Sequence, residues 1–586
     1  MTDTNAPPHW DLSQFYPPDS NLLKDEIKKL EERVNQFSAW REIVDKRLLA
    51  KEEFIRCVSE LEAIQIASQR IGSYASLGFS QDTTDQRALS LLAQVEALLA
   101  KIDNELLFFE LWWKGLSDGD AASLEEAVPT KRYWLERTRA FKAHTLTEAE
   151  ERIINLKDLT GSVSLVKLYD TLTNAYRFRS DFLPGEEAKL LTREELTVHV
   201  RDHRPEVRAG AYRELFRVFR EDSPVLGQIY QARIRDWRTE KVDLRRYADP
   251  QAVRDKANDL SREVVDSLLR VCRQRAPEVF GRYFRKKAQR LNLPVLTRYD
   301  LYAPLVAQGP QMPFKEGLEL VREAFAAFDP EMAALAMRVA EERRLSADIR
   351  PGKVSGAFCA STVPGETPWV LMSYTGQRRD IFTLAHELGH AVHSMLANNL
   401  DVFTFHSALP LAETASTFGE MLLADKLLQK AEPGPAKDDL GFHLLDDAYA
   451  TVGRQAFFAL FEIEAHRLVA DGATADELSA AYMENLAVQF GDSMEVPQEF
   501  AWEWTAIPHF LHSPFYVYAY SFGQLLVYSL WRIAQKEGPG FAEKLKAILA
   551  KGGSASPEDI LRGAGLGPLD DGFWAGGFEV IESFLD

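Results

Sequence analysis

The stretch TLAHELGHAVHS, residues 383–394, carries residue types at a spacing that suits a catalytic metal site. His386 and His390 are four residues apart, so on a helix both imidazoles lie on one face and reach a single ion. Glu387 follows the first histidine, where its carboxylate can take a proton from water activated by that ion. The pattern therefore predicts a metal-dependent hydrolytic site on a helix.

The alternative for these residues is an ordinary helix that happens to contain two histidines. With 12 His in 586 residues, a chance match somewhere in the chain has a probability below about 4 in 100. Gly389 costs a helix about 1 kcal/mol relative to Ala. We therefore expect that another backbone segment passes close to the helix at Gly389.

The third metal ligand has to come from elsewhere in the chain. His393 follows His386 by seven residues, which is two turns or roughly 10 Å along a helix. A tetrahedral site with bonds near 2 Å does not readily take all three histidines from one straight helix, so we expect His393 to pack beside the site or support a ligand. Other zincin spacings would place the third ligand at leucine or proline. The next carboxylates are Asp401, Glu413 and Glu420.

Two of these carboxylates lie in one apolar-periodic segment, ETASTFGEMLLADKLLQ, which predicts a helix. If this helix packs on the first one, it can deliver Glu413 to the metal. Glu420 lies seven residues further along the same face. We expect Glu420 either to bind the second ring nitrogen of a ligand histidine or to be a solvated helix charge.

Helical patterns dominate the chain. In LLKDEIKKLEERVNQF, the residues Leu23, Ile27, Leu30, Val34 and Phe37 recur at spacings of three and four and form one apolar stripe. Similar long segments follow throughout the sequence. The sequence therefore predicts a mostly α fold.

Strand signals are few, and the clearest one stands directly before the histidine-rich helix. Residues 355–376, SGAFCASTVPGETPWVLMSYTG, contain two short apolar and aromatic runs around a Pro-Gly turn, which predicts an antiparallel hairpin. A break at Pro184 predicts a domain boundary. We expect an N-terminal helical domain at 1–185 and a catalytic domain at 186–586.

Composition restricts the partners and the compartment. The net charge of −19 argues against a nucleic-acid partner and against docking on anionic membranes. Three scattered cysteines form no disulfide framework and fit a reducing compartment. No signal peptide or apolar membrane span is evident, so we expect a cytoplasmic protein. The oligomeric state is left open.

Two quoted segments together resemble a known family. LAHELGHAVHS followed by LAETASTFGEML is similar to the thimet oligopeptidase family of zinc metallopeptidases, and most to its oligoendopeptidase F branch. The hairpin, the late segment IPHFLHSPFYVYAYSFGQLL and the N-terminal segment YWLERTRAFKAHTLTEAEERIIN match as well, so the resemblance covers most of the chain. It implies one Zn²⁺ per chain with Glu413 as the third ligand.

The same resemblance implies a fold and a substrate class. The family fold is a mostly helical, two-lobed bowl with a small β-hairpin beside the metal helix and a deep central channel. Short unstructured peptides enter such a channel, whereas folded proteins do not. The implied activity is hydrolysis of internal peptide bonds, with an edge strand of the hairpin pairing with the extended substrate.

The late segment is the expected source of groups that stabilise the oxyanion formed in amide hydrolysis. In the family, a histidine and a tyrosine of this region bind the substrate carbonyl. His509 best matches the histidine, and Tyr518 best matches the tyrosine, with Tyr516 next and Tyr520 also present. Most of the other aromatic residues here are expected to be core.

Two rival functions remain. A zinc carboxypeptidase of similar helical build would need a cation for the terminal carboxylate, and Arg378 and Arg379 are candidates, although exposed charges are the simpler interpretation. A non-catalytic peptide-binding protein with a structural zinc would need four protein ligands, with His393 as the fourth.

Overall fold

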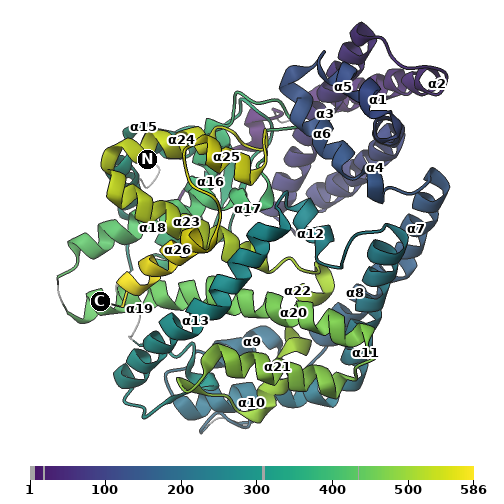
Figure 1. The fold of residues 1–586 in the computed structure, drawn as a ribbon. Helices are drawn as coiled ribbons and strands as arrows, with labels where there is room; N and C mark the ends of the chain where they lie inside the picture. The colour runs from purple at the N-terminus through teal and green to yellow at the C-terminus, as the bar shows by residue number, and fades with distance from the viewer. Residues whose placement is uncertain (1–6, 18–19, 186, 306–310, 433, 586) are drawn as a thin grey trace. The chain divides into compact units, whose positions relative to one another are not determined.

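The computed structural model describes residues 7–17, 20–185, 187–305, 311–432 and 434–585, and Figure 1 labels their helices in chain order. The described chain is mostly helical with a few short strands, as predicted. It forms two compact units, each assembled from three stretches. Unit 1 comprises Met1–Ala143, Gln308–Gln429 and Ala534–Leu566, and unit 2 comprises His144–Ala307, Lys430–Ile533 and Gly567–Asp586.

Unit 1 holds the histidine-rich helix. Its helices are α1 (Leu22–Phe37), α2 (Trp40–Val44), α3 (Lys51–Gln81), α4 (Gln86–Gly115), α5 (Asp118–Glu125), α6 (Arg132–Ala140), α14 (Phe314–Phe328), α15 (Pro330–Glu341), α16 (Arg378–Leu396), α17 (Leu409–Ala412), α18 (Thr414–Lys430), α24 (Phe541–Leu549) and α25 (Pro557–Gly563). The predicted stripe of α1 faces a core shared with α3 and α4, where Leu30, Val34 and Phe37 are buried. The long helices α3 and α4 lie side by side (Figure 1).

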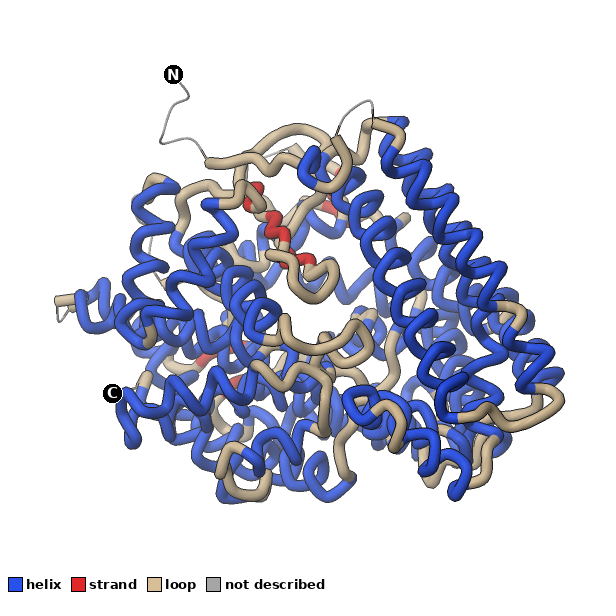
Figure 2. The backbone as a smooth tube through the Cα atoms, turned by 90° about the horizontal axis from the view of Figure 1, so that it is seen from above, coloured by secondary structure: helices blue, strands red, loops and turns tan. Residues whose placement is uncertain are grey.

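A three-stranded sheet in unit 1 contains the predicted hairpin (strands red in Figure 2). β5 (Phe358–Ala360) pairs antiparallel with β6 (Trp369–Leu371), and Cys359 lies opposite Val370. Gly365 supplies the positive φ of 88° that the turn requires. A strand that we did not predict, β4 (Leu345–Ser346), pairs parallel with β6, so the order is β4-β6-β5 and β5 is an edge strand.

Unit 2 is built around the long helix α13. Its helices are α7 (Glu148–Thr160), α8 (Ser162–Asn174), α9 (Arg193–His199), α10 (Pro205–Glu221), α11 (Ser223–Trp237), α12 (Ala252–Ala257), α13 (Arg262–Arg290), α19 (Pro435–Ala448), α20 (Arg454–Ala470), α21 (Ala475–Phe490), α22 (His509–His512) and α26 (Asp571–Ser583), and most of α23 (Tyr518–Glu537) belongs to it. Helix α13 contacts α20, α21 and α26. Two two-residue pairings complete the unit, β1 (Phe178–Arg179) with β2 (Leu190–Leu191) and β3 (Leu296–Thr297) with β7 (Met494–Glu495).

The compact units do not follow a single cut in the sequence, because each one collects stretches from both sides of residue 185. The division into 1–185 and 186–586 stays a prediction, as do the bowl and its channel. No helix in the described ranges has both the length and the apolar character needed to cross a lipid bilayer.

Candidate active site

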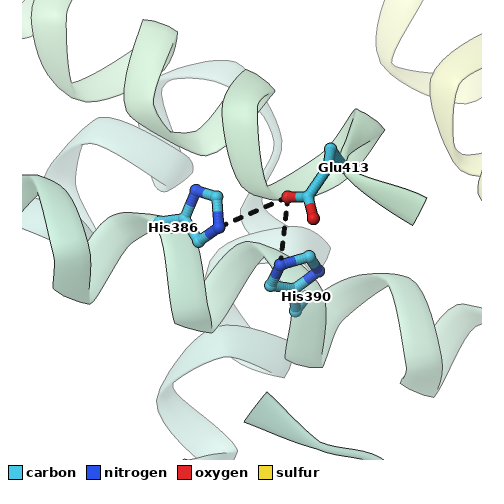
Figure 3. A group of neighbouring side chains, drawn as sticks. All are labelled: His386, His390 and Glu413. Atoms are coloured by element: carbon cyan, nitrogen blue, oxygen red, sulfur yellow. Dashed lines mark ion pairs between the residues drawn. The ribbon is translucent and has the colours of Figure 1, made fainter. Parts of the chain in front are cut away.

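Helix α16 presents the two histidines of the motif. Its first turn is fixed by Asp380, whose Oδ2 accepts hydrogen bonds from the backbone N–H groups of Thr375 and Gln377. One helical turn separates His386 from His390, and their ring centroids are 4.8 Å apart at an interplanar angle of 85°. Figure 3 shows both rings turned toward the same carboxylate.

A glycine contact brings the second helix onto α16. A Cβ atom added at Gly389 would lie 2.4 Å from the carbonyl oxygen of Ala415 and 2.6 Å from Cα of Ser416, at the start of α18. In return, a Cβ at Gly419 of α18 would lie 2.8 Å from the carbonyl oxygen of Ala385 in α16. The close backbone approach predicted at Gly389 is therefore confirmed, and it holds the two helices at a short separation.

This crossing places Glu413 opposite the histidines. Glu413 stands between the one-turn helix α17 and α18, and its Oε2 lies 3.3 Å from Nε2 of His386 and 3.3 Å from Nε2 of His390 (Figure 3). Ser416, one turn later, donates its hydroxyl to the same Oε2 at 2.9 Å. The three donor groups thus converge on one point, two from α16 and one from the residue that directly precedes α18.

The spacing of these donor atoms fits a bound divalent ion. Ligand bonds of about 2.0–2.1 Å in a tetrahedron place neighbouring donor atoms roughly 3.3–3.4 Å apart, and the two measured separations agree with that value. Among the described residues, His386, His390 and Glu413 form the group with donor atoms close enough to share an ion. His393 is not part of this group, so the fourth protein ligand that a structural zinc would need is not supplied by it.

His393 instead contacts the backbone beside the third carboxylate. It is buried, and its ring hydrogen-bonds to the backbone of Ala412, the residue before Glu413. Burial lowers the pKa of His393 to about 4, so the ring is neutral at neutral pH. This contact fixes the chain just before Glu413.

Glu420 is engaged with a histidine of the group. Its Oε1 accepts a hydrogen bond from Nδ1 of His386 at 2.6 Å. That bond leaves Nε2 of His386 as the nitrogen that faces Glu413. The contact supports the first of the two expectations for Glu420, which is a role in orienting His386.

Glu387 lies on the buried side of the motif beside the hairpin. Its side chain is buried, and burial raises its pKa, while the neighbouring histidines lower it. The charge of Glu387 in turn acts on Cys359 of the edge strand β5, whose thiol pKa is raised mainly by burial. A carboxylate with a raised pKa is a stronger base than an exposed one.

The late His/Tyr segment belongs to unit 2. His509 opens the short helix α22, and its ring centroid lies 6.4 Å from that of Tyr516 and 5.8 Å from that of Tyr520. The Tyr520 hydroxyl is 3.4 Å from Nε2 of His509. The structure therefore brings His509, Tyr516 and Tyr520 together as one cluster.

Tyr518, which we predicted to contact the substrate, has a different environment. It is buried, its hydroxyl donates to Oδ1 of Asp255 at 2.9 Å, and it accepts a hydrogen bond from Asn258 at 2.9 Å. In the helical turn that begins α23, residues two apart lie on opposite faces and residues four apart on the same face, so Tyr518 faces α12 while Tyr516 and Tyr520 face the cluster. The Tyr518 hydroxyl is thus engaged with Asp255 and Asn258, whereas Tyr516 and Tyr520 lie beside His509; the catalytic role of each tyrosine stays a prediction.

The backbone of this segment is held by side chains that the sequence did not single out. Arg233 of α11 donates to the carbonyl of Leu511 at 3.2 Å. The fully buried Glu462 of α20 accepts the backbone N–H of Phe515 at 2.9 Å, where φ is +58°. The detectable signal was a glutamate inside the apolar run FFALFEIEAH.

The two arginines that a carboxypeptidase could use to bind a terminal carboxylate lie on the surface. Arg378 and Arg379 open α16, and both are exposed. The contacts described for unit 1 give neither arginine a role in the metal group.

Comparison with known proteins agrees with this site. Residues 198–578 match the model of Peptidase family M3, and residues 116–178 match that of Oligopeptidase F. The chain is 25% identical to Oligopeptidase PepF of Bacillus subtilis, covering 96% of this chain and 84% of that protein. It is 26% identical to an Oligoendopeptidase F homolog of Borreliella burgdorferi, covering 96% and 95%.

Solved structures show the same fold. A putative peptidase from Chlamydophila abortus superposes with a TM-score of 0.85 at 22% identity, over 98% of both chains. Oligoendopeptidase-F from Enterococcus faecium gives a TM-score of 0.72, over 96% of this chain and 97% of that one. The family matches imply a divalent metal and peptide substrates. The chain therefore belongs to peptidase family M3 and is a metallo-oligoendopeptidase of the oligoendopeptidase F group, a hydrolase of peptide bonds.

Proposed function

We propose that His386, His390 and Glu413 hold one Zn²⁺ and that the chain cleaves short unstructured peptides internally. The observation that carries the proposal is the pair of 3.3 Å separations that join the two imidazole Nε2 atoms to one carboxylate oxygen. Two neutral imidazoles and one carboxylate are a ligand set typical of catalytic zinc. When bound, the ion lowers the pKa of water and polarises the scissile carbonyl.

The side chains around this group have separate tasks. A carboxylate oxygen of Glu387 takes a proton from the attacking water and then delivers it to the amide nitrogen of the leaving group. Glu420 keeps the tautomer and orientation of His386 through its bond to Nδ1. His393 holds the chain next to Glu413 through the backbone of Ala412.

His509 and Tyr516 are proposed to stabilise the oxyanion, with Tyr520 as the second tyrosine of the cluster. The ring N–H of His509 and a tyrosine hydroxyl are neutral donors suited to that charge. Burial first, and then the charges of His512 and Arg454, lower the pKa of His509, which favours the neutral ring. The family match over residues 198–578 includes both the metal group and the His509 segment, which supports the proposal that they act on the same substrate.

Substrate binding and location complete the proposal. The edge strand β5 can pair with an extended peptide, which gives affinity with little side-chain preference. A cytoplasmic location is supported by three free cysteines, two of them buried. A net charge of −19 supports a role without nucleic acid.

The test is cleavage of a short peptide blocked at both ends, read by mass spectrometry. Internal cleavage that a chelator abolishes and Zn²⁺ restores is expected, whereas a carboxypeptidase leaves this peptide intact. The variant Glu387→Gln should retain one zinc per chain and lose turnover by about a hundredfold or more. Near-normal turnover in this variant would overturn the assignment of the base.

A further inference from the structure

Unit 2 carries an uncompensated positive charge beside the His509–Tyr516–Tyr520 cluster, although the chain has a net charge of −19. The first source is Arg254 of α12, which is half-buried. Its guanidinium lies 5.8 Å from the centre of the Tyr516 ring, and its Nε donates to the carbonyl of Pro514 at 3.3 Å. In the part of the chain that the structure describes, Arg254 forms no ion pair with a carboxylate.

Of the two carboxyl groups near Arg254, one has other partners and the other is uncharged. Asp255 accepts the Tyr518 hydroxyl and lies 3.2 Å from Nε of Arg262. Glu462 is fully buried, and burial raises its pKa to about 8, so it is mainly uncharged at neutral pH. Neither group therefore cancels the charge of Arg254.

A second surplus charge comes from two arginines that share one carboxylate. Glu503 lies 2.8 Å from Nη2 of Arg298 and 3.2 Å from Nη2 of Arg454. Arg298 is buried, and its Nε and Nη1, like Nε of Arg454, have no hydrogen-bond partner among the described residues. Two guanidinium groups against one carboxylate leave one positive charge.

Arg454 is the arginine of this pair that faces outward. Its side chain is 29% exposed, whereas that of Arg298 is 2% exposed. Arg454 also lowers the pKa of His509, after burial and His512, so its charge is felt at the cluster. Arg254 thus lies at the Tyr516 ring, and the charge of Arg454 acts on His509, so two cations from two helices act on members of the same cluster.

We propose that Arg254 and Arg454 form a carboxylate-binding subsite beside His509 and Tyr516, which selects peptides with an anionic group at one position. The anionic group is an acidic side chain or the free C-terminal carboxylate of a short peptide. Guanidinium groups bind either carboxylate through charge-assisted hydrogen bonds. This inference rests on the proposed function, because it concerns the substrate of that same enzyme.

The experiment compares doubly blocked peptides that differ by Glu or Gln at one position, moved along the peptide, with one peptide whose C-terminus is free. At one position we expect the Glu peptide, or the free terminus, to have about tenfold higher kcat/KM, mainly through KM. If the higher kcat/KM appears in an internal Glu peptide, the subsite binds an acidic side chain; if it appears in the peptide with the free C-terminus, the subsite binds the terminal carboxylate. Arg254→Met should bring the Glu/Gln ratio to about one, and Arg254→Glu should favour Lys at that position.

Arg270→Met is the matched control, because Arg270 is an exposed arginine of unit 2 paired with Asp571. It changes the charge by the same amount and should keep the wild-type ratio. Arg454→Met serves as the second variant if Arg254→Met does not fold. The subsite is refuted if both peptides of each pair are cleaved equally, or if the preference survives in both variants. Cleavage of the Gln peptides tests the proposed function separately, since failure to cleave any peptide contradicts that function alone.

Discussion

At the scale of single residues, the site depends on side chains that orient others. Glu420 accepts a 2.6 Å hydrogen bond from Nδ1 of His386. His393 was placed beside the site by helix geometry alone, and its bond to Ala412 is the kind of contact that only the folded chain reveals. The sequence predicted the residue types at the centre because their spacing is local to one helix. It could not predict which tyrosine is buried, since that depends on α12, which is distant in sequence.

Glu420→Gln should weaken metal binding. The amide cannot fully replace the carboxylate that accepts the Nδ1 proton, so we expect affinity to fall by about 10- to 100-fold. Competition of each variant against a zinc-binding dye measures this. Asp425→Asn, on the same helix and away from His386, is the control and should bind zinc as the wild type does. Unchanged zinc affinity in Glu420→Gln would show that Glu420 does not support metal binding by His386.

Glu462 predicts a pH dependence of stability. Burial raises its pKa from 4.5 to about 8, so between these values the folded chain holds a proton that the unfolded chain has lost. The free energy of unfolding should therefore fall by about 1.4 kcal/mol per pH unit as pH rises through this window. Tyr230 and Arg254 interact electrostatically with the same carboxyl.

Denaturant unfolding of the wild type and Glu462→Gln across this range measures the effect. The variant should lack this part of the slope. Parallel profiles for the two proteins would show that Glu462 is ionised in the folded state.

At the scale of elements, the crossing of α16 and α18 is what brings Glu413 to the histidines. Gly389 was predicted to mark a close approach because a glycine inside a helix has a cost. The hairpin was also predictable, since its turn and alternation are local. The strand β4 was not, because a two-residue parallel strand is defined by its pairing with β6 at residues 369–371 and has no local pattern of its own.

Gly389→Ala tests this crossing. The added Cβ would lie 2.4 Å from a backbone oxygen that no side-chain rotation can move. We expect a loss of about 1–3 kcal/mol in unfolding free energy and weaker zinc binding, because Glu413 moves with α18. Gly78→Ala in α3 is the control: its Cβ meets nothing within 4 Å. That change should be neutral or stabilise by up to about 1 kcal/mol. Similar effects of both changes would contradict the role of the crossing.

At the scale of the whole molecule, the chain builds two compact units from interleaved stretches. Helix content was predictable from periodicity, but this interleaving was not, since it depends on contacts such as α13 with α26 across the sequence. The metal group lies entirely in unit 1, and the His509 cluster lies in unit 2. The units should therefore respond differently to the metal.

Hydrogen exchange with and without Zn²⁺ tests this difference. Binding stabilises the state that holds the ligands, so amides of α16 and α18 should exchange at least about tenfold more slowly with zinc. Amides in the middle of α13 serve as the internal control and should change little. Equal protection of both units would contradict a metal site confined to unit 1.

The most direct test is a crystal structure with zinc, measured at the zinc absorption edge. We predict one anomalous peak within about 2.2 Å of Nε2 of His386, Nε2 of His390 and a carboxylate oxygen of Glu413. A peak without Glu413 in bonding range, or one enclosed by a fourth protein side chain, would contradict the account.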